Sequence, residues 1–440
     1  MYLRIVQGIE SAVAEGSLRT GDRMPAQRHL ARVLGVDLTT ITRAYDEAKA
    51  RKLLIARGAL GTFVAAAQFD LAQLIDLGMN IPPMPEHVDF AALLRQGIGQ
   101  VLTHADPALL MTYHPGGGSD ADRRAGALWL KPLLGNVPAS RIVTCPGSQA
   151  ALAALVLAHT LPGDAVAMEP LVYPGIMAAV RQLGRRVVAV HVDADGMCPE
   201  ALGDACQRDG VRLLYLNPAL QNPVATTMPA TRRQAIVEVA RRCHIPIVED
   251  DPYSLLAPEP PPPLAALAPD NVHYIGTLSK CLTPGLRTAY VVSPDATGQQ
   301  RFLHALRSVT LMSTPLMTSV ATQWIHDGTA AQLLADIRAE CAARQEMAAR
   351  ALRTRDLAIG HGIHIWHALP DHWTSMDLAR DARAEGLAVR SSEAFRAGAH
   401  APNAIRISLG GVAQRARLGA ALKRLAALIE RGPDHGDVII

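Results

Sequence analysis

The stretch Thr277-Leu-Ser-Lys-Cys-Leu-Thr-Pro-Gly-Leu-Arg-Thr-Ala-Tyr290 places a single lysine, Lys280, among hydroxyl groups, a Pro-Gly turn and an arginine. The apolar segments 272–275 and 290–292 on either side predict two short buried strands, with Lys280 on the loop between them. Burial and a nearby cation lower the pKa of an amine, and the neutral amine is the form that attacks an aldehyde. An ordinary loop lysine is the alternative, because Ser-Lys pairs are common. The choice depends on what the rest of the chain brings to this loop.

Length and composition favour a protein of several domains. The chain has 440 residues, more than one hydrophobic core usually holds, so we expect two or three domains. No run of about 18 uncharged apolar residues occurs, and the first residues lack the pattern of a signal peptide. The six cysteines are scattered without a C-x-x-C pair, so we expect reduced thiols and no metal site. These features predict a cytoplasmic protein with no membrane partner.

Positive charge is concentrated at the start of the chain. Residues 1–64 carry ten Lys or Arg against six Asp or Glu, whereas the rest of the chain carries 33 basic and 34 acidic residues. Within this segment, apolar residues at helical spacing predict a first helix over residues 5–13, closed by Gly16. A second helix is expected from Pro25 to Leu34.

A third helix is expected to open at Asp37, a good N-cap residue, and to present Thr39, Thr40 and Arg43 in its first two turns. Residues 55–64 follow as a β-hairpin wing. Two helices joined by a sharp turn, the second with polar and basic leading residues, form the layout that enters the major groove of DNA. A small helical cap or a dimerisation segment is the alternative.

Residues 4–64 resemble the winged helix-turn-helix of GntR-type regulators. The resemblance rests on the spaced motifs Gly16-x-Leu18-x-x-Gly21, Met24-Pro25-x-x-Arg28-x-Leu30-Ala31, Thr42-Arg43-Ala44-Tyr45 and Gly61-Thr62-Phe63-Val64. It implies that the following residues approach double-stranded DNA, the last of them from the wing: Arg28, Thr39, Thr40, Arg43 and Arg57. Asp37 stands where a serine is usual, and Ala59-Leu60 replaces Gly-Arg at the wing tip. One monomer should therefore bind DNA weakly, and a dimer is expected.

The remainder of the chain predicts an α/β fold. Residues 65–87 mix small residues with prolines and predict a linker. Strands are then expected at 141–144, 165–168, 186–190, 211–216 and 245–249. Strands with β-branched cores, separated by helix-length segments, predict a mainly parallel sheet with helices on both faces. Ligands of such sheets bind at the carboxyl ends of the strands.

Polar groups follow four of these expected strands: Ser148-Gln149 at a helix start, Tyr173 between prolines, Asn222 in a proline-rich loop, and Asp250, Asp251 and Tyr253. Each alone has an ordinary explanation as a helix start, a core tyrosine or a solvated carboxylate. Together with Lys280 they supply an anion site, an aromatic plate, an amide, a carboxylate, a phenol and an amine. Pyridoxal phosphate requires this set of groups.

Residues 90–430 resemble a fold-type I aminotransferase domain, and the resemblance implies a role for each position. Lys280 would hold the internal aldimine, Asp250 the pyridine nitrogen, and Tyr253 and Asn222 the phenolic oxygen, with Tyr173 stacked on the ring. The phosphate would be bound by Ser148, Gln149, Thr277, Ser279 and Arg287, and by Tyr113 from a partner subunit. The resemblance selects Asp250 over Asp251 because it places the carboxylate three residues before the tyrosine.

Near the C-terminus, Asn403-Ala-Ile-Arg406-Ile-Ser-Leu409 resembles the strand whose arginine binds the α-carboxylate of a substrate. A surface strand residue is the alternative for Arg406. The resemblance also implies a large cofactor-binding domain at 88–325 and a small C-terminal α/β domain at 326–430, with a long helix over 330–355.

The fusion of the two parts resembles the MocR subfamily of GntR-type bacterial regulators. This resemblance implies a homodimer whose large domain senses pyridoxal phosphate, or an aldimine of a small amino compound, and controls DNA binding. A true aminotransferase acting on an amino acid is the alternative, because the site residues form a complete set. A cofactor-binding scaffold with neither activity is a third possibility.

Overall fold

The chain folds into two compact units, Met1–Leu74 and Ile75–Ile440. The computed structural model describes residues 1–14, 17–18, 21–51, 53–56, 58, 61–64, 74–114, 116–352 and 360–433. Within these residues, no helix combines the length and apolar character needed to cross a membrane.

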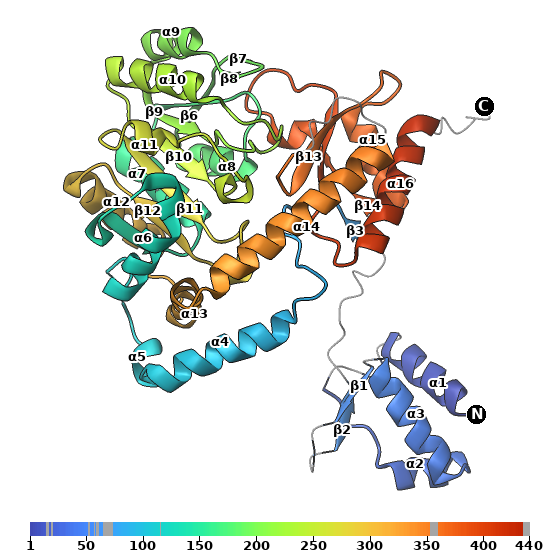
Figure 1. Cartoon of the computed structure of the whole chain (residues 1–440). Helices are drawn as coiled ribbons and strands as arrows, with labels where there is room; N and C mark the ends of the chain where they lie inside the picture. The colour runs from blue at the N-terminus through green and yellow to red at the C-terminus, as the bar shows by residue number, and fades with distance from the viewer. Residues whose placement is uncertain are drawn as a thin grey trace. The chain divides into compact units, whose positions relative to one another are not determined.

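The first unit is a three-helix domain with a small hairpin (Figure 1). Its elements are α1 (Tyr2–Ala14), α2 (Gln27–Leu34), α3 (Leu38–Ala50), β1 (Leu54–Ala56) and β2 (Thr62–Val64). β1 and β2 pair antiparallel, as expected for a wing. A small core that includes Ile9, Ile41, Tyr45 and Val64 holds the helices and the hairpin together. Gly16, expected to close the first helix, lies outside the described residues.

The second helix starts later than predicted. It begins at Gln27 rather than at Pro25, because two hydrogen bonds hold the preceding residues in an extended conformation. The N–H of Met24 donates to the carbonyl of Thr62 at 2.8 Å, and the Tyr45 hydroxyl donates to the carbonyl of Pro25 at 2.8 Å. The third helix opens as predicted, with the Asp37 carboxylate accepting from the N–H of Thr39.

The second unit is built on a seven-stranded sheet with the order β4-β12-β11-β10-β9-β5-β6. The strands are β4 (Ile142–Cys145), β5 (Ala165–Met168), β6 (Arg186–Ala189), β9 (Val211–Leu216), β10 (Ile247–Asp251), β11 (Val272–Thr277) and β12 (Ala289–Val292). β12 runs antiparallel to both neighbours, β4 and β11. The other neighbouring pairs are parallel, so the expectation of a mainly parallel sheet is confirmed.

Helices cover both faces of this sheet. They are α4 (Phe90–His104), α5 (Pro107–Leu110), α6 (Asp120–Leu134), α7 (Ser148–His159), α8 (Pro174–Gln182), α9 (Pro199–Asp209), α10 (Ala230–Arg242), α11 (Leu264–Leu267), α12 (Ala296–Val309) and α13 (Pro315–His326). A short pair, β7 (Val192–Asp193) and β8 (Gly196–Met197), precedes α9. Alternate residues of β9 divide between two cores: Leu214 and Leu216 pack with α6, α9, α10 and α13, whereas Leu213 and Tyr215 pack with α7, α8 and α12. The strands are therefore buried on both faces.

A smaller α/β part follows the long helix α14 (Thr329–Leu352), drawn in orange in Figure 1. It contains β13 (His364–Ala368), α15 (Ser375–Ala384), β14 (Leu387–Ala388), β15 (Arg390–Ser391), β16 (Ala404–Ser408) and α16 (Arg415–Arg431). The end of the predicted long helix, after Leu352, lies outside the described residues. β13 and β15 both pair antiparallel with β16.

The segment that follows the first unit joins this smaller part. β3 (Ile75–Asp76) pairs parallel with β14, so residues 75–87, expected to belong to a linker, form part of the second unit. Beyond β3, the chain passes the carboxyl ends of the large sheet, where Asn80 is buried. We call residues 75–83 the strap.

Candidate functional site

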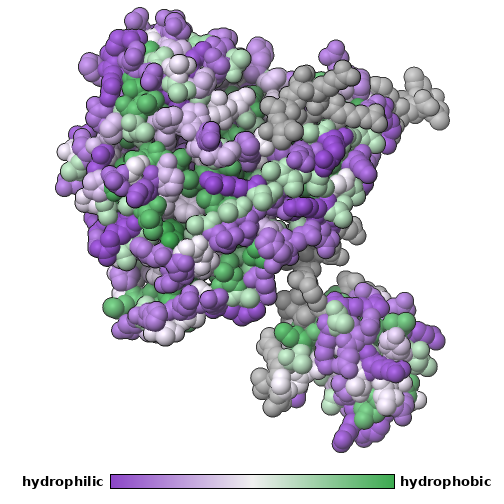
Figure 2. All heavy atoms as spheres, viewed as in Figure 1, coloured by the Kyte–Doolittle hydropathy of each residue, from purple (hydrophilic) through white to green (hydrophobic). Residues whose placement is uncertain are grey.

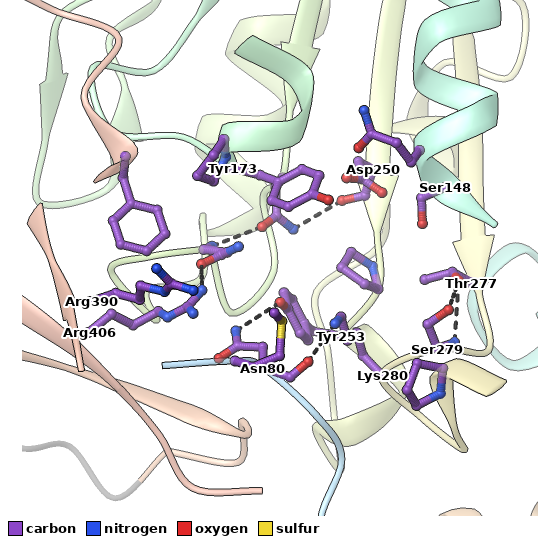
Figure 3. A pocket seen from close by; sticks show the side chains of 18 of the residues that line it. Asn80, Ser148, Tyr173, Asp250, Tyr253, Thr277, Ser279, Lys280, Arg390 and Arg406 are labelled. Carbon is purple, nitrogen blue, oxygen red and sulfur yellow. Dashed lines mark hydrogen bonds between the residues drawn. The ribbon is translucent and has the colours of Figure 1, made fainter. Parts of the chain in front are cut away.

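A cavity of about 450 Å³ lies where the carboxyl ends of the large sheet face the smaller part and the strap (Figure 3). Nearly all of the predicted cofactor and carboxylate residues line it: Ser148, Gln149, Tyr173, Asn222, Asp250, Tyr253, Thr277, Ser279, Lys280, Arg287 and Arg406. The chain thus brings together side chains from the ends of β4, β5, β9, β10 and β11 with one from β16.

Lys280 lies directly after β11, with its side chain largely buried in this cavity. Its Nζ donates a hydrogen bond to the carbonyl oxygen of Asn80 at 2.5 Å. Burial lowers the pKa of Lys280 to about 8, the charges of Arg406 and Arg287 add to this effect, and Asp250 opposes it. More of the amine is therefore neutral near pH 7 than for an exposed lysine, and the neutral form is the one that attacks an aldehyde.

Asp250 and Asp251, adjacent at the end of β10, have different surroundings. Oδ2 of Asp250 accepts from the hydroxyl of Tyr215 at 3.0 Å, while its buried Oδ1 has no hydrogen-bond partner among the described residues. Burial raises the pKa of Asp250 to about 7, although the Tyr215 hydrogen bond works in the opposite direction. Asp251 accepts from the Tyr274 hydroxyl at 2.7 Å and from the N–H of Ser254 at 2.8 Å.

These contacts separate the two carboxylates by role. Asp250 lines the cavity and keeps one buried acceptor atom free, which fits the protonated nitrogen of a pyridine ring. Both carboxylate oxygens of Asp251 accept hydrogen bonds, from its own loop and from the neighbouring strand β11.

One end of the cavity suits an anion. Ser148 and Gln149 begin α7, whose first-turn N–H groups point out of the helix. Arg287 approaches the same turn, and its Nη2 donates to the carbonyl of Pro146 at 3.1 Å. Gly147 has a φ of 92°, and a Cβ there would meet the Arg287 guanidinium at 3.0 Å, so only glycine fits this close approach. The Thr277 and Ser279 hydroxyls, 3.1 Å apart, complete a site that fits a phosphate group.

The opposite end of the cavity is formed by Arg406, which is only 6% exposed. Its Nη1 donates to Oδ1 of Asn222 at 2.7 Å, and its Nη2 donates to the carbonyl of Gly78 in the strap. The guanidinium lies 4.9 Å above the ring of Phe395, and its buried Nε has no partner among the residues that the structure describes. Burial lowers the pKa of Arg406 to about 10, so the group stays charged and has a free donor to offer a carboxylate.

Sequence reasoning missed Asn80 and Arg390, both of which line the cavity. The Asn80 amide donates to the Tyr253 hydroxyl at 3.2 Å and lies 3.1 Å from Nδ1 of the buried His364. Asn80 lies in a proline-rich segment whose composition predicts a linker. The one sequence feature that could have indicated a site there is an amide side chain among apolar residues. Arg390 belongs to a two-residue strand, too short to leave a periodic pattern.

Tyr113 lies apart from this cavity. Its side chain is 76% exposed, and it lines a second cavity of about 430 Å³ with Leu109, His114 and Asp122. The role implied for Tyr113 requires a partner subunit, so it stays a prediction.

In the first unit, Arg28, Thr39 and Arg43 are exposed and Thr40 is partly exposed. Thr39 is tied to Asp37 through its hydroxyl, at 2.5 Å, and through its N–H, at 2.8 Å. The side chain of Arg43 makes no hydrogen bond or ion pair within the described residues of the unit and is exposed to an outside partner. Arg57, predicted to approach phosphate from the wing, lies outside the described residues.

A winged helix-turn-helix followed by a fold-type I domain with this cavity defines a pyridoxal phosphate-binding transcriptional regulator. Residues 1–64 match the family of bacterial regulatory proteins of the gntR type, and residues 72–425 match the aminotransferase class I and II family. The chain belongs to the aminotransferase class I and II family and, with its GntR-type domain, to the MocR subfamily of regulators. Pyridoxal 5′-phosphate is the cofactor of this fold family.

Similar proteins include both regulators and enzymes. The chain is 27% identical to the HTH-type transcriptional regulator YdeF of Bacillus subtilis, covering 93% of this chain and 90% of that protein. It is 29% identical to the vitamin B6 salvage pathway transcriptional repressor PtsJ of Salmonella typhimurium, covering 92% of this chain and 93% of that protein. An archaeal alanine:glyoxylate aminotransferase structure aligns with a TM-score of 0.74 at 25% identity, covering 82% of this chain and 93% of that one.

Proposed function

We propose that this regulator binds pyridoxal phosphate and a small amino compound in the cavity around Lys280, and that occupancy of the cavity changes its affinity for DNA. One observation carries the proposal: a DNA-binding unit and a cavity lined by an amine, a carboxylate, phenols and the start of a helix occur on one chain. When bound, pyridoxal phosphate supplies an aldehyde that a primary amine can attack and a ring that withdraws electrons.

Each end of the cavity has a task in this proposal. The neutral amine of Lys280 would attach the cofactor, and Oδ1 of Asp250 would accept a hydrogen bond from the protonated ring nitrogen. The phosphate binds at the α7 N-terminus and Arg287, and the carboxylate of the amino compound binds Arg406. The remaining contacts are to the ring and its phenolic oxygen, from Tyr173, Tyr253 and Asn222.

The strap offers a route from the cavity toward the DNA-binding unit. Lys280 donates to the carbonyl of Asn80, and Arg406 donates to the carbonyl of Gly78. These two donors are the groups that the cofactor and the ligand carboxylate would engage, so binding competes with the strap for both. Because the strap begins where the first unit ends, at Ile75, a change in it acts directly on the chain that leads to the DNA-binding unit. A ligand shifts such an equilibrium only through different affinities for the two states.

A homodimer is supported by the apolar surface around α4 and α5. Large apolar side chains are exposed there and on the loop that precedes α13: Leu102, Leu109, Met111, Tyr113 and Leu311. Figure 2 shows apolar residues among the polar ones on this part of the second unit. Tyr113 does not line the cavity of its own chain. A partner subunit that covers this surface would bring Tyr113 toward the phosphate site of that partner.

Replacing Arg43 with alanine should weaken binding to a DNA fragment selected by the full-length protein and reduce the slope of log affinity against log salt by about one. The reason is that a guanidinium in contact with phosphate releases one counterion. Fluorescence anisotropy at several salt concentrations measures both effects. Arg51→Ala is the matched control, since Arg51 is at the far end of α3 and paired with Glu47 at 2.8 Å. Equal slopes for Arg43→Ala and the wild type would refute the placement of Arg43 at DNA.

Loading the full-length protein with pyridoxal phosphate, and then adding a panel of amino acids, should change its affinity for the selected DNA by roughly 5- to 150-fold, the usual range of coupling between sites. In the same titration, hydrogen exchange of the strap should change, because Lys280 and Arg406 release its carbonyls. Pyridoxal, which lacks the phosphate group, is the control ligand. DNA affinity that stays constant from apoprotein to amino acid-loaded protein would refute the proposal.

An aminotransferase is the second candidate, and the complete set of polar groups in the cavity supports it. The two functions differ in turnover. Release of an oxo acid over many cycles, with DNA affinity unaffected by the ligand, would favour the enzyme.

A further inference from the structure

Two arginines face the same part of the cavity. Arg390 of β15 is the direct antiparallel partner of Arg406 in β16, and side chains at directly opposite positions lie on the same face of a sheet. Both residues line the cavity, and Figure 3 shows their guanidinium groups side by side.

The two arginines differ in their contacts. Arg406 is buried, with bonds to Asn222 and Gly78 and with Phe395 beneath it. Arg390 is exposed to the cavity side, and no hydrogen bond or ion pair of its side chain is present among the described residues. Like charges at opposite positions of a strand pair repel, and Arg390 contributes to the lowered pKa of Arg406.

Asp76 is an acidic residue close to this pair; its charge raises the pKa of Arg406 against the larger effect of burial, and it makes no direct ion pair with Arg390 among the described residues. A Cβ on Gly78 would lie 3.3 Å from Oδ1 of Asp76 and 3.2 Å from Nε of Arg390, so the two groups flank the same residue of the strap. Oδ1 of Asp76 accepts from the N–H groups of Gly78 at 2.7 Å and Met79 at 3.0 Å. The carboxylate thus holds the turn of the strap.

The proposed function assigns a group of the cofactor or the ligand to every charged residue that lines the cavity except Arg390. Among the described residues that line the cavity, the cations are Lys280, Arg287, Arg390 and Arg406, and the acid is Asp250. In that function Lys280 and Asp250 would hold the cofactor's aldehyde and ring nitrogen, Arg287 would hold its phosphate, and Arg406 would hold one carboxylate. One cation remains, placed beside the carboxylate site and open to the cavity.

We propose that Arg390 binds a second anionic group, so that the preferred ligand of this cavity is an amino acid with a carboxylate at each end. This inference rests on the proposed function, and it adds the class of ligand. Arg406 holds the α-carboxylate, and Arg390 holds the distal one. A monocarboxylic ligand would leave Arg390, which lines the cavity, without a ligand group to bind.

The test uses full-length protein loaded with pyridoxal phosphate and two ligand pairs that differ only in charge, aspartate with asparagine and glutamate with glutamine. Binding is read from the change in cofactor absorbance and, independently, from the shift in melting temperature. We expect at least one acid to bind about tenfold more tightly than its amide, the lower end for a charge-assisted contact that is partly exposed to water.

Arg390→Gln should remove the preference for the acid over its amide, and Arg390→Lys should retain part of it. Arg383→Gln is the control, because Arg383 is an exposed arginine of α15 outside the cavity. A preference that persists in Arg390→Gln, or an equal loss of affinity for acid and amide, would overturn the inference; the equal loss would show that both arginines bind one carboxylate.

The outcome for the wild type separates this inference from the function on which it rests. If acids and amides bind equally well, the assignment of Arg390 is wrong and the proposed function stands. If no amino acid changes the absorbance or the melting temperature of the loaded protein, sensing of an amino compound is itself refuted.

Discussion

Replacing Lys280 with alanine should abolish the visible absorption band of the cofactor-loaded protein and leave only cofactor that dialysis removes. Among the described residues that line the cavity, Lys280 is the single amine, and it lies at the end of β11 beside Asp250 and Tyr253. Its lowered pKa makes the neutral amine available near neutral pH. Without this amine the cofactor keeps its phosphate and ring contacts but has no covalent attachment.

The band is followed by absorbance spectroscopy after dialysis, and attachment by mass spectrometry after reduction with borohydride. Lys131→Ala is the matched control, because Lys131 is an exposed lysine of α6 that does not line the cavity. Its spectrum should equal that of the wild type. An unchanged band and an unchanged reduced mass in Lys280→Ala would exclude Lys280 as the anchor.

Much of the cavity was predictable because parallel strands bring their carboxyl ends to one edge of the sheet. Ser148, Tyr173, Asn222 and Asp250 each follow a strand that could be read from its apolar residues, so their meeting follows from chain order. The roles given to these residues came from the resemblance to a family and stay predictions.

The residues that sequence reasoning missed depend on contacts between distant parts of the chain. Asn80 lies in the cavity because Ile75 pairs with Leu387, and the two-residue strands that pair are too short for a local sequence pattern to predict the pairing. Arg390 is placed by its register opposite Arg406, and a shift of one residue would turn it to the other face. The late start of α2 has a similar cause, since the contact of Tyr45 with the Pro25 carbonyl links residues 20 apart.

The strap and the second arginine meet at Gly78. Its carbonyl accepts from Arg406, and Arg390 lies against the position where its side chain would be. A ligand with two carboxylates would therefore act on both arginines that surround this residue of the strap. The same few groups around Gly78 would therefore select the ligand and pass the effect of its binding to the strap.

Asp250→Asn should impair cofactor binding and Asp251→Asn should impair stability, although the two residues are neighbours. Asp250→Asn should lower cofactor affinity by about 10- to 100-fold, because the hydrogen bond between a carboxylate and a protonated ring nitrogen is lost. It should not destabilise the apoprotein at pH 8. Asp251→Asn should lower the melting temperature with or without cofactor, because it weakens the acceptor for Tyr274 and Ser254, at a cost of about 1–3 kcal/mol.

The expectation for the apoprotein follows from the sign of the pKa shift. Burial raises the pKa of Asp250 from its ordinary value of 3.8 to about 7. A carboxyl group whose pKa is higher in the folded state contributes stability that is fully present below about pH 4 and is lost as the pH rises through about 7. At pH 8 the wild-type apoprotein therefore holds a buried, ionised carboxylate whose Oδ1 has no partner in the described part of the chain. Asparagine removes that charge, so the variant should melt at the same temperature as the wild type or higher.

Thermal melts of both variants at pH 8, each with and without pyridoxal phosphate, measure the two effects in one experiment. The cofactor should raise the melting temperature of Asp251→Asn nearly as much as that of the wild type, and that of Asp250→Asn far less. The protonated ring nitrogen compensates the carboxylate of Asp250, so the residue that weakens the empty protein is the one that strengthens the loaded protein. If Asp251→Asn instead lost the response to cofactor while Asp250→Asn kept it, the assignment of the ring-nitrogen partner would be reversed.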